Sequence, residues 1–186
     1  MMYLGIDNAN DGAACLIDKS QRLLVCISWR IATRKKIKKF EISVFTDNKT
    51  KKFYIDKSFL ELGKTIYKVV YPFCIGRLTI GIEDTFVRNN IKTCITLTKN
   101  NSYVSCILEH LFKKEIHWIA PQTWRSSLGF KKQKRELAKQ ASLDYIPNEI
   151  YDLDLALSAL GRLDHITDGA GIALHLLKKE QYGRKD

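Results

Sequence analysis

Acidic side chains stand where two apolar segments end and where the last helical pattern begins. Asp7 closes the first apolar run, Glu83 closes a later one, and Asp164, His165 and Asp168 open the helical stretch. Residues three or four apart share one face of a helix, so 165 and 168, and also 164 and 168, would face the same way. Oxygen-rich clusters of this kind suit Mg²⁺ or Mn²⁺, and two such ions about 4 Å apart can hold the attacking and leaving oxygens of a phosphodiester.

Each of these residues also has an ordinary structural explanation. Asp7 could be a solvated residue at a strand end, and either aspartate of the last helix could cap its start. His165 could be a half-exposed residue of the first turn, and Glu83 could pair with Arg88. Their coincidence in one basic chain favours a shared site, because a buried cluster of carboxylates needs a counter-charge.

The elements that must position these residues are strands at first and then helices alternating with single strands. Apolar or alternating runs predict strands over Tyr3–Asp7, Ala13–Asp18, Arg22–Trp29, Ile42–Phe45, Phe53–Ile55, Leu78–Glu83 and Ile116–Ala120. Helical spacing predicts helices over Phe59–Val70, Ser102–Lys113, a stretch through Leu137–Ala141 that ends at Pro147, and residues 164–177. This order predicts a mixed sheet, antiparallel at one edge and parallel elsewhere, with helices on both faces.

Length and charge narrow the class of protein. The 186 residues suit one domain spanning 1–186. Lys and Arg number 31 against 20 Asp and Glu, a formal charge of +11. This excess favours a polyanionic partner, although an acidic membrane or mere solubility would give the same sum. The basic cluster 34–39 is predicted as a solvated connection, with phosphate contact or a localisation signal as alternatives.

Nothing in the sequence suggests a membrane or an exported protein. No apolar run reaches the length of a membrane span, and the first residues lack the pattern of a signal peptide. The five cysteines form no Cys-x-x-Cys pair and lie mostly in apolar runs, as expected of reduced core thiols. We therefore expect no membrane partner and an intracellular location: cytoplasm, nucleoid or, for a viral protein, the host compartment.

Four ordered segments resemble the landmarks of RuvC-type Holliday junction resolvases, members of the ribonuclease H-like superfamily. They are Tyr3–Asp7 with Gly12–Ala14, Ile80–Phe86, Ala120–Arg125 and His165–Ala173. The four segments follow the family's order over nearly the whole chain. They are most similar to those of the phage and viral branches of the family. The resemblance implies an α/β ribonuclease H-like fold, with a mixed five-stranded sheet and helices on both faces.

The resemblance also implies a catalytic set. Asp7, Glu83 and Asp168 would be catalytic carboxylates that bind two Mg²⁺ or Mn²⁺ ions. The family position three residues before the last aspartate falls on His165, where most members have Asp and some have His. Either His165 is the fourth catalytic and metal-binding residue, or Asp164 takes that role. A nitrogen ligand would favour Mn²⁺ somewhat over Mg²⁺.

The same comparison suggests residues that contact DNA. Phe86 lies where resolvases carry an aromatic that stacks on an unpaired base, and a core Phe is the alternative. Arg125, Lys132 and Lys134 fall where similar proteins have basic residues near the scissile phosphate. A solvated basic loop is the alternative for these three, and Arg88 joins the set of DNA-binding candidates.

The functional prediction is an endonuclease that resolves four-way DNA junctions by paired symmetric nicks, acting as a homodimer. The stripe Val104, Ile107, Leu108 and Leu111 would serve as dimer interface as well as core. The alternatives are a nuclease of the same fold for RNA/DNA hybrids or flaps, an actin-like ATP-binding protein, and an inactive DNA-binding module. A chain of this length has room for only one of the two domains that an actin-like protein needs.

Overall fold

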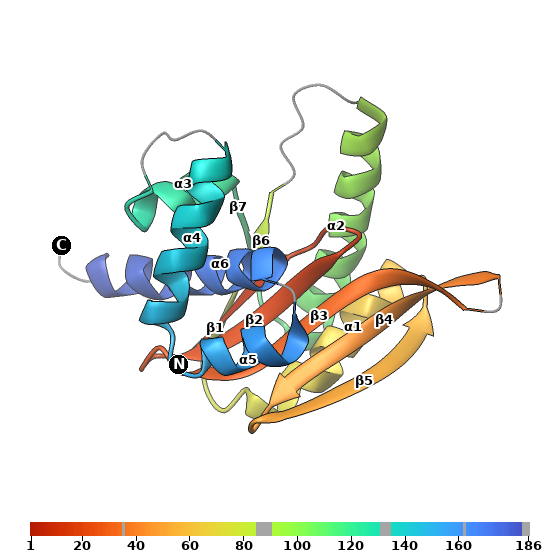
Figure 1. The fold of residues 1–186 in the computed structure, drawn as a ribbon, viewed down its shortest axis with the longest axis horizontal. Coiled ribbons are helices and arrows are strands. Elements are labelled where there is room, and N and C mark those ends of the chain that lie inside the picture. The colour runs from red at the N-terminus through yellow and green to blue at the C-terminus, as the bar shows by residue number, and fades with distance from the viewer. Residues whose placement is uncertain (35, 85–90, 131–134, 162, 184–186) are drawn as a thin grey trace.

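A single mixed sheet carries both predicted strand-end carboxylates. The computed structural model describes residues 1–34, 36–84, 91–130, 135–161 and 163–183. Within these ranges, seven strands lie in the order β5-β4-β3-β2-β1-β6-β7 (Figure 1). Their bounds are β1 Met2–Asp7, β2 Gly12–Asp18, β3 Leu23–Arg34, β4 Ile37–Thr46, β5 Lys49–Asp56, β6 Leu78–Glu83 and β7 Ile116–Ile119.

The sheet is antiparallel from β5 to β1 and parallel from β1 to β7. The antiparallel part follows from short turns between consecutive strands, whereas the parallel part needs helical crossovers. The mixed α/β architecture is confirmed, but the strand count of five is wrong for this chain. The runs around Ile42–Phe45 and Phe53–Ile55 join the same sheet as β4 and β5, because their alternating apolar residues find partners on β3 and β4.

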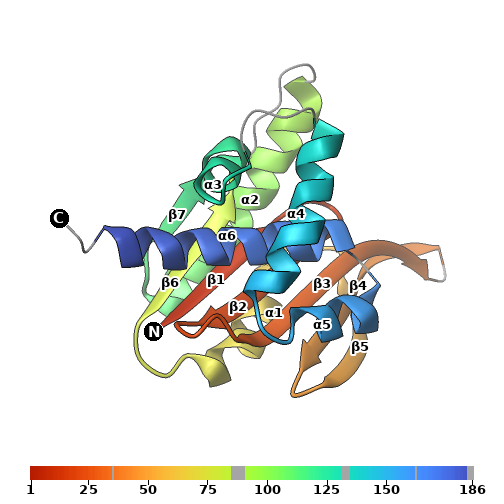
Figure 2. The same cartoon turned by 60° about the vertical axis from the view of Figure 1, so that its left-hand side comes forward.

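Helices cover both faces of the sheet (Figures 1 and 2). Their bounds are α1 Phe59–Val70, the short helix η1 Tyr71–Phe73, α2 Ile91–Phe112, α3 Pro121–Ser127, α4 Arg135–Glu149, α5 Leu153–Leu160 and α6 Leu163–Tyr182. One core cluster joins the sheet to α1 and α2 through residues such as Leu4, Trp29 and Leu62. The other joins it to α3–α6 through residues such as Tyr3, Trp124 and Ala173.

Helix α6 approaches the sheet closely where it crosses β1. A side chain at Gly5 would overlap the backbone oxygen of Gly169 and the backbone nitrogen of Ala173. Figure 2 shows α6 running across the strands. The small residues therefore set the height at which the first turns of α6 pass over the end of β1.

The helices differ from the sequence prediction at four places. Helix α2 begins at Ile91 rather than Ser102. Its first turns carry Ile91, Cys94 and Ile95 at helical spacing, a signal that the prediction did not use. Pro147 lies inside α4, which continues to Glu149, so the proline stands near the end of the helix without ending it. Helices α3 and α5 were not predicted, and both are only seven or eight residues long.

Two other expectations concern membranes and cysteines. None of the helices in the described part of the chain has the length and hydropathy of a membrane span. Cys15 and Cys26 are buried, as predicted, but Cys106 is exposed. It lies on the solvent side of α2, one position away from the buried Ser105.

Candidate active site

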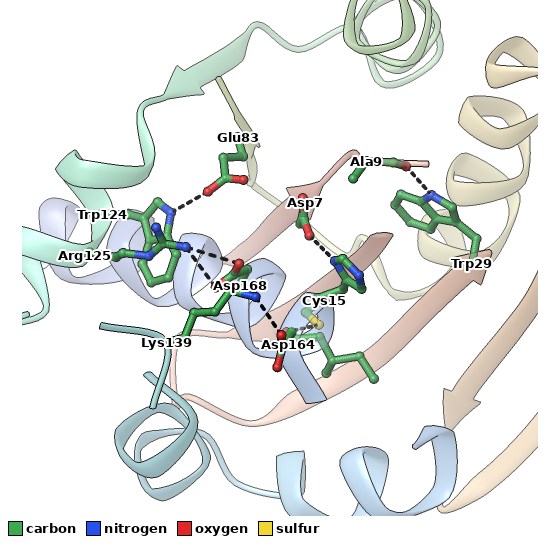
Figure 3. Close-up of polar contacts among 12 residues, drawn as sticks. Asp7, Ala9, Cys15, Trp29, Glu83, Trp124, Arg125, Lys139, Asp164 and Asp168 are labelled. Carbon is green, nitrogen blue, oxygen red and sulfur yellow. Dashed lines mark hydrogen bonds and ion pairs between the residues drawn. The ribbon is translucent and has the colours of Figure 1, made fainter. Parts of the chain in front are cut away.

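The first two carboxylates are neighbours because their strands are parallel. Strands β1 and β6 pair with Ile6 opposite Ile82, so Asp7 and Glu83 end adjacent strands at the same edge. Asp7 pairs with Ala13, a residue of the core beneath α6. Both acidic side chains therefore point towards α6, whose second turn carries Asp168 (Figure 3).

His165 contacts Asp7 directly. Its Nδ1 lies 2.8 Å from Asp7 Oδ2, in a hydrogen bond to a buried carboxylate. This hydrogen bond, and to a lesser extent the charges of Asp7 and Asp168, raise the pKa of His165 above its usual value. The imidazole is therefore held in place and favoured in its protonated form, which is not the behaviour of a free first-turn residue.

Asp164 lies apart from this contact. Its Oδ2 pairs with Lys139 Nζ on α4 at 2.7 Å, and its side chain is about half exposed. The two candidates for the fourth position are thus separated by geometry: His165 faces Asp7, and Asp164 faces Lys139. Asp168 lies too far into α6 to cap its start, so the capping explanation is wrong for that residue.

Glu83 lies in a partly buried, electronegative position. Burial, and then the negative charges of Asp7 and Asp168, raise the pKa of its carboxyl to about 8. A hydrogen bond from Trp124 Nε1 to Glu83 Oε1, at 3.2 Å, works in the opposite direction and fixes the carboxylate on its strand end. Without a further cation, Glu83 holds its proton at neutral pH.

Asp168 is paired with Arg125. The guanidinium Nη2 donates to both carboxylate oxygens at 3.3 Å, and it stacks over the Trp124 ring with the two centres 4.6 Å apart. Burial still raises the pKa of Asp168 to about 6, with Asp7 adding to the shift and Arg125 opposing it. The Nε of Arg125 is buried and finds no partner among the described residues.

Two buried amides connect the strand ends from the other side of the sheet. Asn8 Nδ2 donates to Asn101 Oδ1 at 2.8 Å, and Asn101 Nδ2 donates to the backbone oxygen of Glu83 at 3.0 Å. Asn101 lies on α2, in line with the buried Val104 and Leu108. This chain of hydrogen bonds fixes the ends of β1 and β6 relative to each other.

The remaining DNA-binding candidates lie elsewhere. Phe86, Arg88, Lys132 and Lys134 fall outside the described residues. Arg125 is thus the one candidate of that set that the structure places, and it lies beside Asp168.

Solved structures with a similar architecture include two of RuvC from Thermus thermophilus. One aligns with a TM-score of 0.52 at 12% identity, covering 98% of this chain and 97% of that chain. The other, a complex with Holliday junction substrate, has a TM-score of 0.51 at 12% identity, covering 98% and 96%. The chain has the RuvC fold. A Fowlpox virus resolvase bound to junction DNA aligns with a TM-score of 0.47 at 12% identity, covering 97% and 99%.

Sequence comparisons add nothing to this likeness. No family model matches the chain, and no curated protein matches it. At 12% identity, the structural similarity supports the fold prediction and leaves the activity to be argued from the site.

The donor set suits a divalent cation on this RuvC fold. Three carboxylates and an imidazole offer oxygen and nitrogen ligands. Burial, and then the negative charge of Asp7, raise the pKa values of Glu83 and Asp168, and a bound cation would oppose both effects. Among the described residues, no three His, Cys, Asp or Glu side chains are already gathered at ligand distance. His165 and Arg125 instead supply counter-charges to Asp7 and Asp168.

The sequence analysis did not identify several residues that position the site through hydrogen bonds or ion pairs. The signal for Asn101 was available, because an amide in register with Val104 and Leu108 interrupts an apolar stripe. Trp124 was visible only as part of the resemblance, since its contact with Glu83 joins residues 41 positions apart. The pair Lys139 and Asp164 had no sequence signal at all.

Proposed function

We propose that residues 1–186 form one nuclease domain that cuts four-way DNA junctions with the help of divalent metal ions. The observation that carries this proposal is the convergence of Asp7, Glu83 and Asp168 at one edge of the sheet, where Glu83 and Asp168 have raised pKa values. The RuvC fold supports it, and so does the strongly basic composition, because the net charge of +11 suits a polyanionic substrate.

The metal ligands in this proposal are Asp7, Glu83, His165 and Asp168. Their carboxylate oxygens and the imidazole would hold two Mg²⁺ or Mn²⁺ ions. When bound, such ions activate water and neutralise the charge that develops on the phosphoryl oxygens. Asp7 and Asp168 would exchange their present partners for the ions. Glu83 would release its proton, and His165 would have to bind as the neutral imidazole. Asp164 is left in its pair with Lys139.

Arg125 has a second task in this scheme. Its guanidinium neutralises Asp168 in the metal-free chain. Once Asp168 has another counter-charge, the planar donors of Arg125 are free to bind a phosphate oxygen beside the carboxylates. Trp124 supports the guanidinium through its ring and Glu83 through its indole N–H, so one residue positions both.

We further propose that the chain acts as a homodimer. Two nicks placed symmetrically on opposite strands require two active sites related by a two-fold axis. The predicted interface stripe does not support this directly, because Val104 and Leu108 are buried in the core of their own chain. Ile107 packs beside Gly63 of α1. Another surface must form the dimer contact.

The test is cleavage of an immobile four-way junction beside linear duplex, a flap and an RNA/DNA hybrid, with Mg²⁺ or Mn²⁺. Paired symmetric nicks on the junction alone, absent with Asp7→Asn, are the expected result. Asp47→Asn is the control, because Asp47 is an exposed aspartate in the turn between β4 and β5, and Asn tolerates its left-handed backbone, where φ is 49°. Cutting of the hybrid or flap but not the junction would keep the metal site and overturn the substrate. No metal-dependent cutting of any substrate would overturn the nuclease proposal.

A further inference from the structure

The outer parts of β3 and β4 form a two-stranded ribbon that passes the edge of the sheet. β2 begins at Gly12, which pairs with Trp29, whereas β3 and β4 continue to the pair Arg34 and Ile37. The segment 30–39 therefore has no β2 neighbour. Figure 1 shows this hairpin extending beyond the helices. We call residues 30–39 the basic ribbon.

The basic ribbon carries positive charge and no acidic residue of its own. Six of its ten residues are basic, namely Arg30, Arg34, Lys35, Lys36, Lys38 and Lys39. Arg30 pairs with Glu41 at 2.9 Å, and Lys39 lies 3.5 Å from Asp56. Lys36 and Lys38 are exposed and make no ion pair with any described residue. Their charges are available to a partner.

The charges lie on both sides of the ribbon. Lys38 lies on the same face as Phe40, which packs in the core beneath α1 and α2. Lys39 lies on the opposite face, together with Glu41 and its cross-strand partner Arg30. Ile37, at the outer end, is 60% exposed. A ribbon with one basic face would suit a flat anionic surface. A ribbon that is basic on both faces suits a groove walled by two phosphate strands, and the major groove of DNA admits a two-stranded ribbon.

The ribbon extends from the same end of the sheet as the carboxylates. Hydrogen bonds connect its base to the loop that follows Asp7. Asp7, Ala13 and Ser28 form one row across β1, β2 and β3. The loop after Asp7 is bonded to the base of the ribbon: Trp29 Nε1 donates to the oxygen of Ala9 at 3.0 Å, and the N–H of Ile31 donates to Asp11 Oδ1 at 3.1 Å. The direction of the ribbon is thus fixed relative to the proposed active site.

We propose that the basic ribbon docks in the groove of one duplex arm of the DNA substrate. This inference rests on the proposed function for the position of the scissile phosphate. The outer pair lies six residues beyond the Asp7 row, which is about 20 Å at ~3.3 Å per residue. That length matches roughly six base pairs at ~3.4 Å each. The ribbon contacts phosphates at that distance from the cut and adds affinity without reading sequence.

The test compares two pairs of neutralised lysines. Lys36→Asn with Lys38→Gln removes two ribbon charges, and Asn suits the left-handed backbone of residue 36, where φ is 65°. The control variant combines Lys68→Gln and Lys114→Gln. It removes two exposed charges, one near the end of α1 and one just before β7, at the end of the sheet away from the carboxylates. Circular dichroism confirms that both variants fold.

Affinity is measured by anisotropy of a labelled junction in EDTA, over a range of salt concentrations. The ribbon variant is expected to bind roughly tenfold more weakly, with a salt slope smaller by about two, because each lost phosphate contact contributes about 0.9. The control pair is expected to stay within about twofold of wild type. Equal losses in the two variants, or no loss in the ribbon variant, would overturn the inference.

A second measurement separates this inference from the proposed function. Single-turnover cleavage at saturating enzyme should be unchanged in the ribbon variant, because the ribbon is remote from the carboxylates. Slowed cleavage of fully bound junction would contradict a docking role. If wild type does not cut junctions but the ribbon variant still binds duplex more weakly, the proposed function fails and the ribbon inference stands.

Discussion

The two faces of the sheet are packed by different kinds of residue. The face beneath α1 and α2 is filled by large apolar side chains such as Ile66, Phe40 and Trp29. On the face beneath α6, helix and sheet approach each other closely at β1, because Gly5 and Gly169 have no side chains between the two backbones. The first face keeps its helices a side chain away from the sheet. The second lets a helix approach closely enough for His165 to contact Asp7.

This difference teaches that the site depends on missing side chains as much as on charged ones. Large apolar residues stabilise the fold wherever they pack. Only a close crossing brings charged groups of α6 over the ends of β1 and β6. The difference between the two faces can therefore be tested with two substitutions. One adds a side chain beneath α6, and the other removes a large side chain from the face beneath α1 and α2.

The largest effect is expected from Gly5→Ala. The new methyl would collide with backbone atoms of α6, which cannot move as a flexible side chain can. We expect a loss of stability of about 3 kcal/mol, since overpacking typically costs ~1–3 kcal/mol. Cleavage by the folded protein should fall by about 10²-fold, the order expected for a displacement of ~1 Å at a reacting centre. Thermal unfolding and junction cleavage measure the two effects.

Ile66→Ala is the matched change on the other face. The side chain is fully buried, and its loss should cost roughly 2–5 kcal/mol through the cavity it leaves. Cleavage by the folded fraction should stay near wild type at low temperature. If Ile66→Ala reduced cleavage as strongly as Gly5→Ala, the two faces would not differ in the way described.

A smaller effect is expected from Trp124→Phe. The ring stays in the core, but Glu83 loses the N–H that lowers the pKa of its carboxyl. Protons then compete better with metal ions, so metal affinity at neutral pH should fall by about tenfold, within the range for partners of metal ligands. The acid limb of the cleavage profile should move to higher pH.

Trp29→Phe provides the comparison from the opposite face. Trp29 is equally buried, and its N–H donates to a backbone oxygen instead of a carboxylate. It should lose stability without moving the pH profile. A profile that moves in both variants, or in neither, would contradict the role given to the indole of Trp124.

The last test concerns stability in the absence of metal, where no effect on cleavage is measured. The pKa of Glu83 is raised from 4.5 to about 8, so the folded chain holds a proton that the unfolded chain releases within this window. Stability therefore falls as pH rises from about 5 to 8. Glu83→Gln should be more stable than wild type above that window, by at most about 5 kcal/mol, and no more stable below it.

Asp84→Asn is the control for this measurement, because the neighbouring Asp84 is exposed. Thermal unfolding in EDTA at several pH values should show that the stability difference between Asp84→Asn and wild type does not change with pH. A Glu83→Gln variant whose advantage did not depend on pH would argue against an electrostatic cause.

The sequence predicted what periodicity and residue type control. Apolar runs predicted β1 and β6 with their terminal carboxylates, and also β7, and helical spacing predicted most of α1 and α6. It could not predict that Arg125 pairs with Asp168, or that Trp124 donates to Glu83, because these contacts depend on where the unpredicted helix α3 packs. The segment 34–39 was predicted as a connection. In the described residues, Ile37, Lys38 and Lys39 instead pair with β3, because cross-strand hydrogen bonds compensate for their polar surroundings.

The most direct test of the central claim is a calorimetric titration of Mn²⁺ into the DNA-free protein at about pH 7. The account predicts binding with release of protons, because Glu83 gives up the proton that it holds when metal is absent. Asp7→Asn should abolish or strongly weaken that binding, and Asp47→Asn should not. Equal binding by wild type and Asp7→Asn, or no binding by either, would contradict a metal centre at the end of β1.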